Sequence, residues 1–518
     1  MEVLYYLPYE KEGRQFAFLF HFTGYVKSIS IKGGFVVNKL IAVLAGLTAA
    51  FHAGSIQAWA AEGTAAESAA KVMPAWLCIP FAGLLLCIAI FPLVKEEWWE
   101  KHRPLVVALW SLLFVVPFAV LYGAGSALET VLECIINDYL TFIVLLFGLF
   151  CVAGNITMEG DLAGSPRVNV ILLVIGTLLS SLIGTTGSSM LMVRPVIKMN
   201  SWRRRRSHVM VFFIFLISNI GGCLTPIGDP PILMGFSRGV PFFWSLKLFP
   251  VLLFHMAVLL LIFYWIDRKN YCMDIARGCK PDISKPGTEI KIQGLHNLVF
   301  LVMIVAAVIL SGTLPGLAAF QDAEGRTLGI HIFREVTLTW PALIEIVLIL
   351  AAAFLSFKTT SPEIRRKNHF TWGAIEEVAV LFVGIFITMQ PALMILKTMG
   401  SQLGITKPLE MFWATGILSS FLDNTPTYLV FLTTTGAMGF AEGVSTALGY
   451  IPLKMLMAIS CGAVFMGANT YIGNAPNFMV KSISDENGIR MPSFFGYLLW
   501  SIKILVPVFI LDTIVFFL

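Results

Sequence analysis

Long apolar runs separated by short charged segments follow one another along most of the chain. Most of these runs approach or exceed the ~20 residues that a helix needs to cross a membrane. The runs predict membrane-spanning helices over 75–94, 105–122, 139–158, 208–224 (continuing past a break to 243), 247–266, 296–311, 338–357, 373–395, 453–469 (continuing past a break to 480) and 494–515.

Two further apolar stretches, 168–193 and 411–435, are interrupted at their centres by polar residues with Gly or Pro. We expect each to be a re-entrant hairpin that enters and leaves on the same side. With this path, most Lys and Arg residues fall in loops on one side, among them the run Arg203–Arg206. Cytoplasmic loops carry such an excess of positive charge, so the distribution supports the hairpin prediction.

The composition agrees with many spans. Of 518 residues, 57% are hydrophobic and 13% are charged, and the mean hydropathy is +0.82. Soluble domains carry about 25% charged residues, so a soluble enzyme with one anchor is excluded. The fold class predicted is an all-α polytopic membrane protein. The net charge of +5 reflects cytoplasmic loops and predicts no nucleic-acid partner.

The amino-terminal region has two possible interpretations. Residues 37–60 combine a basic start, a short apolar core and Ala58-Trp59-Ala60, the arrangement of a signal peptide. They form either a cleaved signal or an uncleaved first transmembrane helix. Residues 1–36 show no strong pattern and remain an unassigned extension.

Similar motifs recur in the same order in the two halves of the chain. Leu179–Ser188 aligns with Leu418–Thr427, and Thr225–Pro231 aligns with Thr470–Pro476. The predicted topology starts the two halves on opposite sides of the membrane. We therefore expect two inverted five-helix repeats, 75–266 and 296–515, joined by a cytoplasmic linker at 267–295. Inverted repeats with broken helices are typical of secondary transporters, whose site lies where the repeats meet.

Polar residues gather at the two hairpin tips and the two helix breaks. Pro removes a backbone donor and Gly permits unusual dihedrals, so carbonyl groups become free at these points. Together with side-chain oxygens they suit sodium better than a soft metal. The alternative is that the hydroxyls only bond to the helix backbone. The candidate ion- or substrate-binding residues are Thr185, Thr186, Gly187, Ser188, Asn219, Thr225, Gly228, Asn424, Thr425, Thr427, Asn469, Thr470, Gly473, Asn474 and Asn477.

Two acids, Asp229 and Asp423, lie within these predicted interruptions. An acid at membrane depth is costly and is a candidate functional residue. One carboxylate can hold either a proton or a sodium ion, and this competition suffices for exchange. Each acid has an alternative role as a helix cap. His208 is expected in a solvated loop at the cytoplasmic boundary.

These motifs resemble a known superfamily. Gly184–Pro195, Ser218–Pro231 and Phe421–Thr427 are similar to segments of NhaD-type sodium/proton antiporters and the related citrate carriers of the ion transporter superfamily. The resemblance covers roughly residues 75–515. It implies two inverted five-span repeats with hairpins, a homodimer with a scaffold and a moving part, and ion sites at the tips and breaks. Divalent-anion symporters of this superfamily carry Ser-Asn-Thr at both tips, which this chain lacks.

The function expected is a sodium (or lithium)/proton antiporter in the inner, cytoplasmic membrane, with Asp423 and Asp229 as exchanging acids. The alternative is a sodium- or proton-coupled symporter of citrate or another organic anion. An intramembrane aspartyl protease is disfavoured, since Pro226-Ile227-Gly228-Asp229 lacks the first glycine of its G-x-G-D signature. We expect no enzyme activity and no cofactor. The expected partners are small ions, the bilayer and a second copy.

Overall fold

A computed structural model describes residues 73–159, 163–280, 291–368, 370–399 and 404–518. The predictions for 1–36 and 37–60 lie outside the described residues. The chain divides into two compact units, residues 1–71 with 372–376 and residues 72–371 with 377–518. Nearly all described residues belong to the second unit, which is considered by itself below.

Helices form most of this unit. Within the described ranges, nine helices are long and apolar enough to cross a membrane, and one bent pair raises this number to ten. The bent pair is Gly373–Thr388 with Gln390–Lys397, which meet at an angle of 40°. The protein is thus an all-α polytopic membrane protein.

The first half of the unit contains the elements η1 (Ala75–Cys78), α3 (Ile79–Val94), α4 (Glu96–Tyr122), α5 (Ala124–Glu133), η2 (Cys134–Leu140), α6 (Thr141–Gly154), β1 (Thr157–Glu159), α7 (Pro166–Ile183), α8 (Thr185–Met199), α9 (Ser207–Leu216), η3 (Ile220–Leu224), α10 (Pro230–Ser237), η4 (Phe242–Leu248) and α11 (Phe249–Ala276). Proline at the first or second position starts α7, α10 and α11, where a missing N–H costs nothing.

The second half contains β2 (Lys291–Gln293), α12 (Asn297–Thr313), η5 (Leu314–Gly316), η6 (Ala318–Phe320), β3 (Gly329–Phe333), β4 (Val336–Thr339), α13 (Trp340–Thr359), α14 (Pro362–Lys367), α15 (Gly373–Thr388), α16 (Gln390–Met399), α17 (Pro408–Phe421), α18 (Asn424–Gly436), β5 (Val444–Thr446), β6 (Gly449–Ile451), α19 (Leu453–Met466), η8 (Gly467–Asn469), α20 (Ala475–Glu486), α21 (Phe494–Asp512) and η9 (Thr513–Phe517). Antiparallel pairs join β1 to β2, β3 to β4 and β5 to β6.

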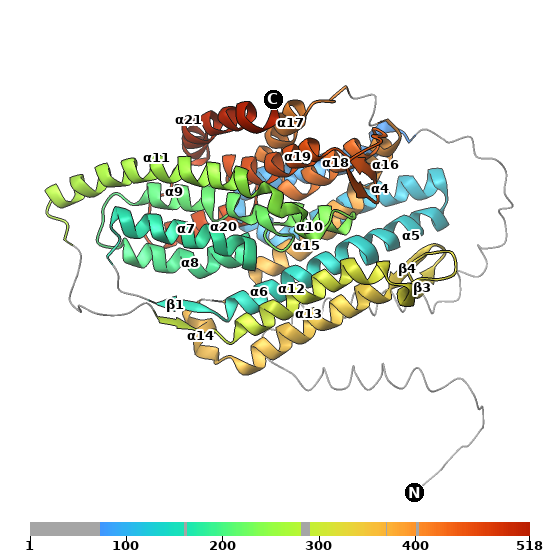
Figure 1. Ribbon diagram of the computed structural model, residues 1–518, viewed down its shortest axis with the longest axis horizontal. Coiled ribbons are helices and arrows are strands. Elements are labelled where there is room, and N and C mark those ends of the chain that lie inside the picture. Colours follow the sequence, from blue (N-terminus) through green and yellow to red (C-terminus); the bar gives the residue numbers. More distant parts are fainter. Residues whose placement is uncertain (1–72, 160–162, 281–290, 369, 400–403) are drawn as a thin grey trace, which may run out of the picture. The chain divides into compact units, whose positions relative to one another are not determined.

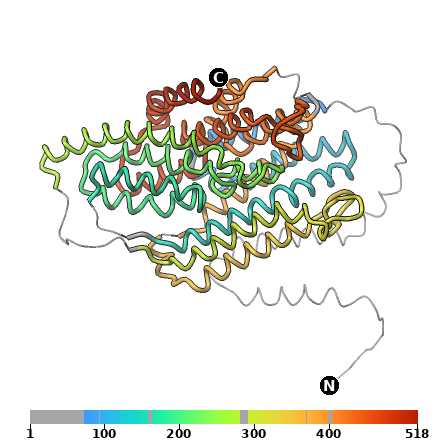
Figure 2. Tube along the Cα trace, in the orientation of Figure 1, coloured from blue at the N-terminus to red at the C-terminus, as the bar shows by residue number. Residues whose placement is uncertain are grey.

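Two groups of helices are visible (Figures 1 and 2). In one, α6, α12 and α13 pack side by side. In the other, α7–α11 lie among α17–α21, and α17 packs closely on α19. Helix α8 contacts both α6 and α20, so it lies where the two groups meet. The second group contains both predicted hairpin segments and both predicted breaks.

Two boundaries differ from those predicted by hydropathy. Helix α11 continues to Ala276, so the first residues of the expected linker 267–295 are helical. Its acids Asp267 and Asp274 are fully buried. Helical structure also begins at Ala124, well before the predicted start of the span 139–158. Charged residues interrupt the apolar pattern in both extensions, and in α11 the two acids are buried and paired, which hydropathy does not detect.

The prediction that His208 lies in a solvated loop is wrong, and the arginine run is not wholly exposed. Arg203 and His208 are buried. Arg203 Nη2 lies 2.6 Å from Asp267 Oδ1, and His208 Nε2 lies 2.8 Å from the same oxygen. Asn169 donates to the other oxygen of Asp267 at 3.0 Å. A buried charge needs such partners, and this cluster ties α7, α9 and α11 together.

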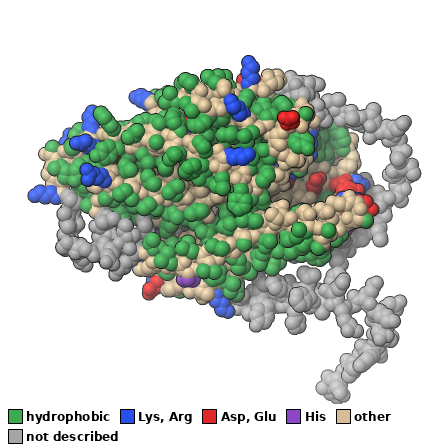
Figure 3. Space-filling model, in the orientation of Figure 1, with side chains coloured by type: hydrophobic (Ala, Val, Ile, Leu, Met, Phe, Trp, Pro, Cys, Tyr) green, Lys and Arg blue, Asp and Glu red, His purple; other side chains and the backbone are tan. Residues whose placement is uncertain are grey.

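The surface agrees with membrane insertion. The face seen in Figure 3 is mostly hydrophobic, with Lys and Arg side chains gathered at the end where α11 finishes. Many large apolar residues, such as Val120, Leu261 and Trp265, are more than half exposed. A soluble monomer rarely exposes contiguous apolar surface on this scale, whereas a bilayer would cover it.

Candidate functional site

The first predicted hairpin segment forms two helices joined at one glycine. Gly184 has a φ of +81°, a conformation that other residues avoid, and separates α7 from α8. In the second segment, Leu422 and Asp423 separate α17 from α18. Each pair of helices packs together. The interruptions thus occur at the predicted tips, while the re-entrant path of each pair through a membrane stays a prediction.

Both predicted helix breaks are present. In the first break, the chain leaves α9, passes through η3 and becomes helical again at α10. In the second break, it leaves α19, passes through η8 and becomes helical again at α20. Asp229 and Asn474 occupy the residue before the resumed helix in the two breaks. Their dihedrals are nearly equal, with φ −148° and ψ 141° for Asp229 and φ −154° and ψ 140° for Asn474.

The same side-chain hydrogen bonds recur in both halves. Thr225 Oγ1 donates to the carbonyl of Ser181, and Thr470 Oγ1 donates to the carbonyl of Ser420. These residues align in the two sequence motifs. Each bond attaches a break to the first arm of its hairpin segment. Local structure therefore repeats along with sequence, while the inverted orientation of the halves stays a prediction.

Two aligned glycines allow each break to fold on itself. A Cβ atom at Gly228 would collide with the carbonyl oxygen of Gly222, and one at Gly473 would collide with that of Gly467. Backbone, which cannot turn aside as a side chain can, forms the obstacle in both cases. This close packing explains why the predicted site residues at positions 228 and 473 are glycines. It does not show that either residue binds a ligand.

Asp229 lies where the two tips and the two breaks meet. Its carboxylate accepts hydrogen bonds from Thr185 Oγ1 at 2.8 Å, Asn424 Nδ2 at 2.7 Å and Asn474 Nδ2 at 3.2 Å. The residue is only 1% exposed. Thr185 and Asn424 align with each other in the repeat, as do Asp229 and Asn474. The four residues thus combine the first tip, the second tip and both breaks, and we call them the Asp229 cluster.

A second contact links the breaks beside this cluster. Asn219 Nδ2 donates to Asn477 Oδ1 at 2.7 Å, and Asn477 Nδ2 donates to the carbonyls of Gly467 and Thr470. Among the described residues, the buried oxygens Asn219 Oδ1 and Asn469 Oδ1 have no hydrogen-bond partner. A buried oxygen without a donor is available to a cation.

Asp423 has a different environment. Its Oδ1 accepts the backbone N–H of Thr425 at 3.0 Å, which makes it the N-cap of α18. Thr427 Oγ1 donates to the Asp423 carbonyl within the same turn. In contrast, the side chain of Asp229 does not cap α10 and points to residues of other elements. The cap interpretation therefore holds for Asp423 and not for Asp229.

The remaining candidates line the same region without contacting Asp229 by hydrogen bonds. Ser188 Oγ donates to the carbonyl of Gly176, and Asn469 Nδ2 donates to Ser420 Oγ at 2.9 Å. Thr186 is half-buried in α8. A Cβ at Gly187 would lie 3.0 Å from that of Ala153 in α6, so Gly187 permits close helix packing.

Two acids, Asp229 and Asp423, lie at the tips and breaks of the described structure. Within the described ranges, no Lys or Arg forms an ion pair with Asp229 or Asp423. The same ranges contain no group of three His, Cys, Asp or Glu side chains suited to a metal ion. Neutral hydroxyl, amide and carbonyl groups surround the single carboxylate, and such hard oxygens suit alkali and alkaline-earth ions.

A buried pair elsewhere escaped the sequence reasoning. His255 Nδ1 of α11 lies 3.1 Å from Asp512 Oδ2 of α21, and both side chains are completely buried. Asp512 could have been noticed in the sequence, since it is an acid within an apolar span. It was overlooked because it lies near the end of that span.

The comparisons with known proteins provide the family. No curated protein matches the chain. A family model described as "Putative citrate transport" matches residues 70–517. This family is a family of transporters, which agrees with the multi-pass membrane architecture. Because the match covers most of the sequence, the chain belongs to this citrate transport family.

Proposed function

We propose that the protein is a secondary transporter that exchanges sodium or lithium for protons, with Asp229 as the exchanging acid. One observation carries this proposal: a buried carboxylate lies where both tips and both breaks meet, and only neutral groups hydrogen-bond to it. A proton and a monovalent cation would compete for this carboxylate. Exchange follows if each binds only when the other has left.

Two unpartnered oxygens in the described helix breaks support a cation site. Asn219 Oδ1 and Asn469 Oδ1 are buried without partners in the described structure. We propose that these oxygens, together with Asp229, provide a sodium ion with its shell, while Thr185 and Asn424 orient the carboxylate.

Among the described residues, the lack of a Lys or Arg paired with either acid argues against an organic anion as the sole substrate. Like charges at close range repel strongly where the dielectric constant is low. Citrate would meet Asp229 and Asp423, and no described Lys or Arg forms an ion pair with either residue. Bound cations would have to neutralise these acids first.

The family match favours a second candidate, a cation-coupled symporter of citrate or another organic anion. In this scheme the Asp229 cluster holds the coupling cation, and the cation then attracts the carboxylate substrate. Both schemes place a cation at Asp229 and differ in what accompanies it. The inverted topology, the homodimer and the inner-membrane location belong to either scheme as proposals.

Inverted membrane vesicles with an imposed pH gradient separate the two candidates. Sodium, lithium, potassium and citrate are added in turn while the lumenal pH is followed with a fluorescent dye. Antiport predicts dequenching by sodium or lithium without citrate. Asp229→Asn should abolish the response, because the amide keeps the side-chain size but carries neither a proton nor a charge.

Asp322→Asn is the matched control, because Asp322 lies in an exposed loop and undergoes the same chemical change. It should exchange at the unmodified rate. A response to citrate plus sodium, with none to sodium alone, would establish symport and contradict the antiport proposal. Full activity of Asp229→Asn would exclude Asp229 from both schemes.

A further inference from the structure

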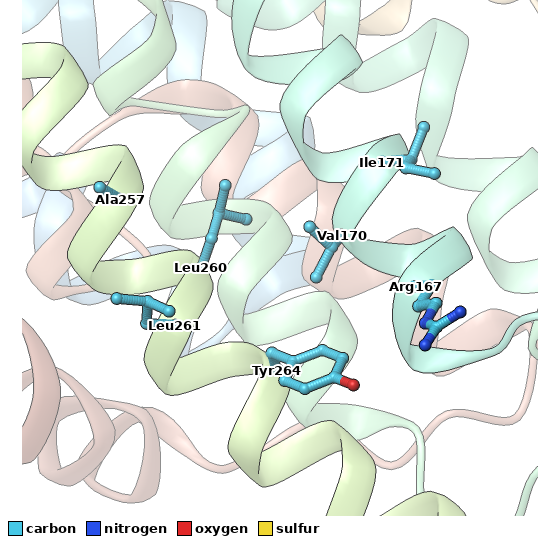
Figure 4. A pocket seen from close by; sticks show the side chains of 7 residues that line it. All are labelled: Arg167, Val170, Ile171, Ala257, Leu260, Leu261 and Tyr264. Atoms are coloured by element: carbon cyan, nitrogen blue, oxygen red, sulfur yellow. The ribbon is translucent and has the colours of Figure 1, made fainter.

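An open groove lies between α7 and α11, away from the Asp229 cluster. Its volume is about 610 Å³, and Val170, Ile171, Ala257, Leu260 and Leu261 line it (Figure 4). Figure 4 shows the guanidinium of Arg167 and the hydroxyl of Tyr264 near one another at one end of the groove. The site is therefore apolar along its length and polar at one end.

The polar end carries more positive charge than Arg167 alone. A smaller hollow of about 330 Å³ shares Tyr264 with the groove and continues along Trp265, Arg268, Lys269 and Cys272. Arg167, Arg268 and Lys269 are exposed. In the part of the chain that the structure describes, no carboxylate forms an ion pair with any of the three. Asp267, the nearest acid in sequence, is already bound to Arg203 and His208.

The polar end also coincides with a membrane boundary. Helix α11 is apolar from Phe249 to Ile266 and turns charged at Asp267, Arg268 and Lys269. The exposed ring of Trp265 lies at this transition, and Trp and Tyr prefer the headgroup level of a bilayer. The lining from Ala257 to Tyr264 extends roughly 10 Å along the helix, comparable to the ~15 Å of one leaflet's hydrocarbon depth.

We propose that this groove binds one anionic phospholipid, with an acyl chain along α7 and α11 and the phosphate at Arg167, Arg268 and Lys269. Charge complementarity selects an anionic headgroup, because a zwitterionic lipid adds its own positive charge to an already cationic site. Guanidinium groups donate two parallel hydrogen bonds to phosphate, and the Tyr264 hydroxyl adds a third donor. The proposed lipid site lies at the N-terminal end of α7, and the first tip lies at the C-terminal end of the same helix.

Native mass spectrometry of the purified full chain tests this proposal. The probes are phosphatidylglycerol and phosphatidylcholine of equal chain length. We expect wild-type protein to retain phosphatidylglycerol preferentially. Arg167→Gln with Arg268→Gln should reduce this preference roughly 25-fold, since each cation near an anionic lipid contributes about fivefold. Equal retention of both lipids by wild-type protein would overturn the proposal.

Two variants separate the headgroup from the acyl chain. Ala257→Trp fills the groove with an uncharged side chain, and Ala257 is exposed, so the ring can be accommodated. It should also lower phosphatidylglycerol retention, whereas a simple phosphate site would be unaffected. Arg366→Gln removes an exposed cation on α14 and should change nothing. Unchanged retention by Ala257→Trp would contradict a lipid in the groove.

A second copy of the chain is the other occupant to exclude. Ile171 is exposed in the groove wall. In a Cys272→Ser background, Ile171→Cys should not form an intermolecular disulfide in native membranes under mild oxidation. An efficient cross-link would show that a neighbouring protomer covers the groove, and the lipid proposal would be lost.

Discussion

The two acids that the sequence singled out have different roles in the structure. Both lie at an interruption between helices, and the sequence makes both of them candidates for the exchanging acid. The Asp423 carboxylate accepts a backbone N–H of its own helix, whereas the Asp229 carboxylate accepts side-chain donors from three other elements. Sequence could identify both acids as unusual. It could not rank them, because the choice of hydrogen-bond partner depends on elements far apart in the chain.

The capping role of Asp423 can be separated from its charge. Asp423→Ala should cost about 1 kcal/mol of stability, whereas Asp423→Asn should cost little, since Asn is an equally good N-cap. Thermal unfolding in detergent measures this difference. In vesicles, Asp423→Asn should keep exchange but raise the sodium KM roughly three- to tenfold, because one negative charge near the site is lost.

Comparing the exchange rates of Asp423→Asn and Asp229→Asn shows whether Asp423 also exchanges ions. If Asp423→Asn abolishes exchange as completely as Asp229→Asn does, Asp423 is itself an exchanging acid. If both Asp423→Ala and Asp423→Asn lower the unfolding temperature equally, the side chain stabilises α18 by something other than its cap.

At the scale of elements, hydropathy located the helices well and their ends less well. Runs such as 338–357 match α13 within a few residues, since one acid, Glu345, is the only charged residue within that run. Helix α11 exceeds its predicted end because Asp267 and Asp274 are buried and paired. A sequence pattern cannot distinguish a solvated acid from one that meets an arginine of a distant loop, as Arg203 meets both acids here.

The pairing at Asp267 should therefore support the packing of α7, α9 and α11. Asp267→Asn leaves Arg203 buried without its closest partner, and breaking a buried pair costs about 3–5 kcal/mol. We expect a clear drop in the unfolding temperature of the detergent-solubilised protein. Glu129→Gln breaks the ion pair with Arg334, a residue that is half exposed, and should cost about 0–1 kcal/mol. Equal melting of the two variants would show that the Asp267 cluster adds no stability.

At the scale of the whole molecule, the sequence repeat anticipated the arrangement of the site. Aligned residues Thr225 and Thr470 make the same bond, and aligned residues Thr185 and Asn424 both reach Asp229. Motif order alone indicated that these regions are equivalent. It could not show that Asn474 touches its own counterpart, because contact between the halves depends on how they pack.

This equivalence predicts that the acid can be moved from one half to the other. Asp229→Asn should be inactive in sodium/proton exchange, and adding Asn474→Asp to it should restore part of the activity. The two positions share their backbone dihedrals, and their side chains lie 3.2 Å apart. The vesicle assay measures the restored rate. A folded double variant with no exchange would show that the halves are not interchangeable at this point.

The pairing of an acid with an amide at these equivalent positions also has a consequence for ion valence. The Asp229 carboxylate balances one unit of positive charge, so a monovalent ion at the proposed site would neutralise this side chain. A divalent ion would leave an uncompensated charge in a region of low dielectric, which is costly. The substitution Asn474→Asp would add a second carboxylate. Two negative charges would then match the charge of a divalent ion. If the proposed cation site exists, an Asn rather than an Asp at position 474 favours a monovalent ion over ions such as calcium or magnesium.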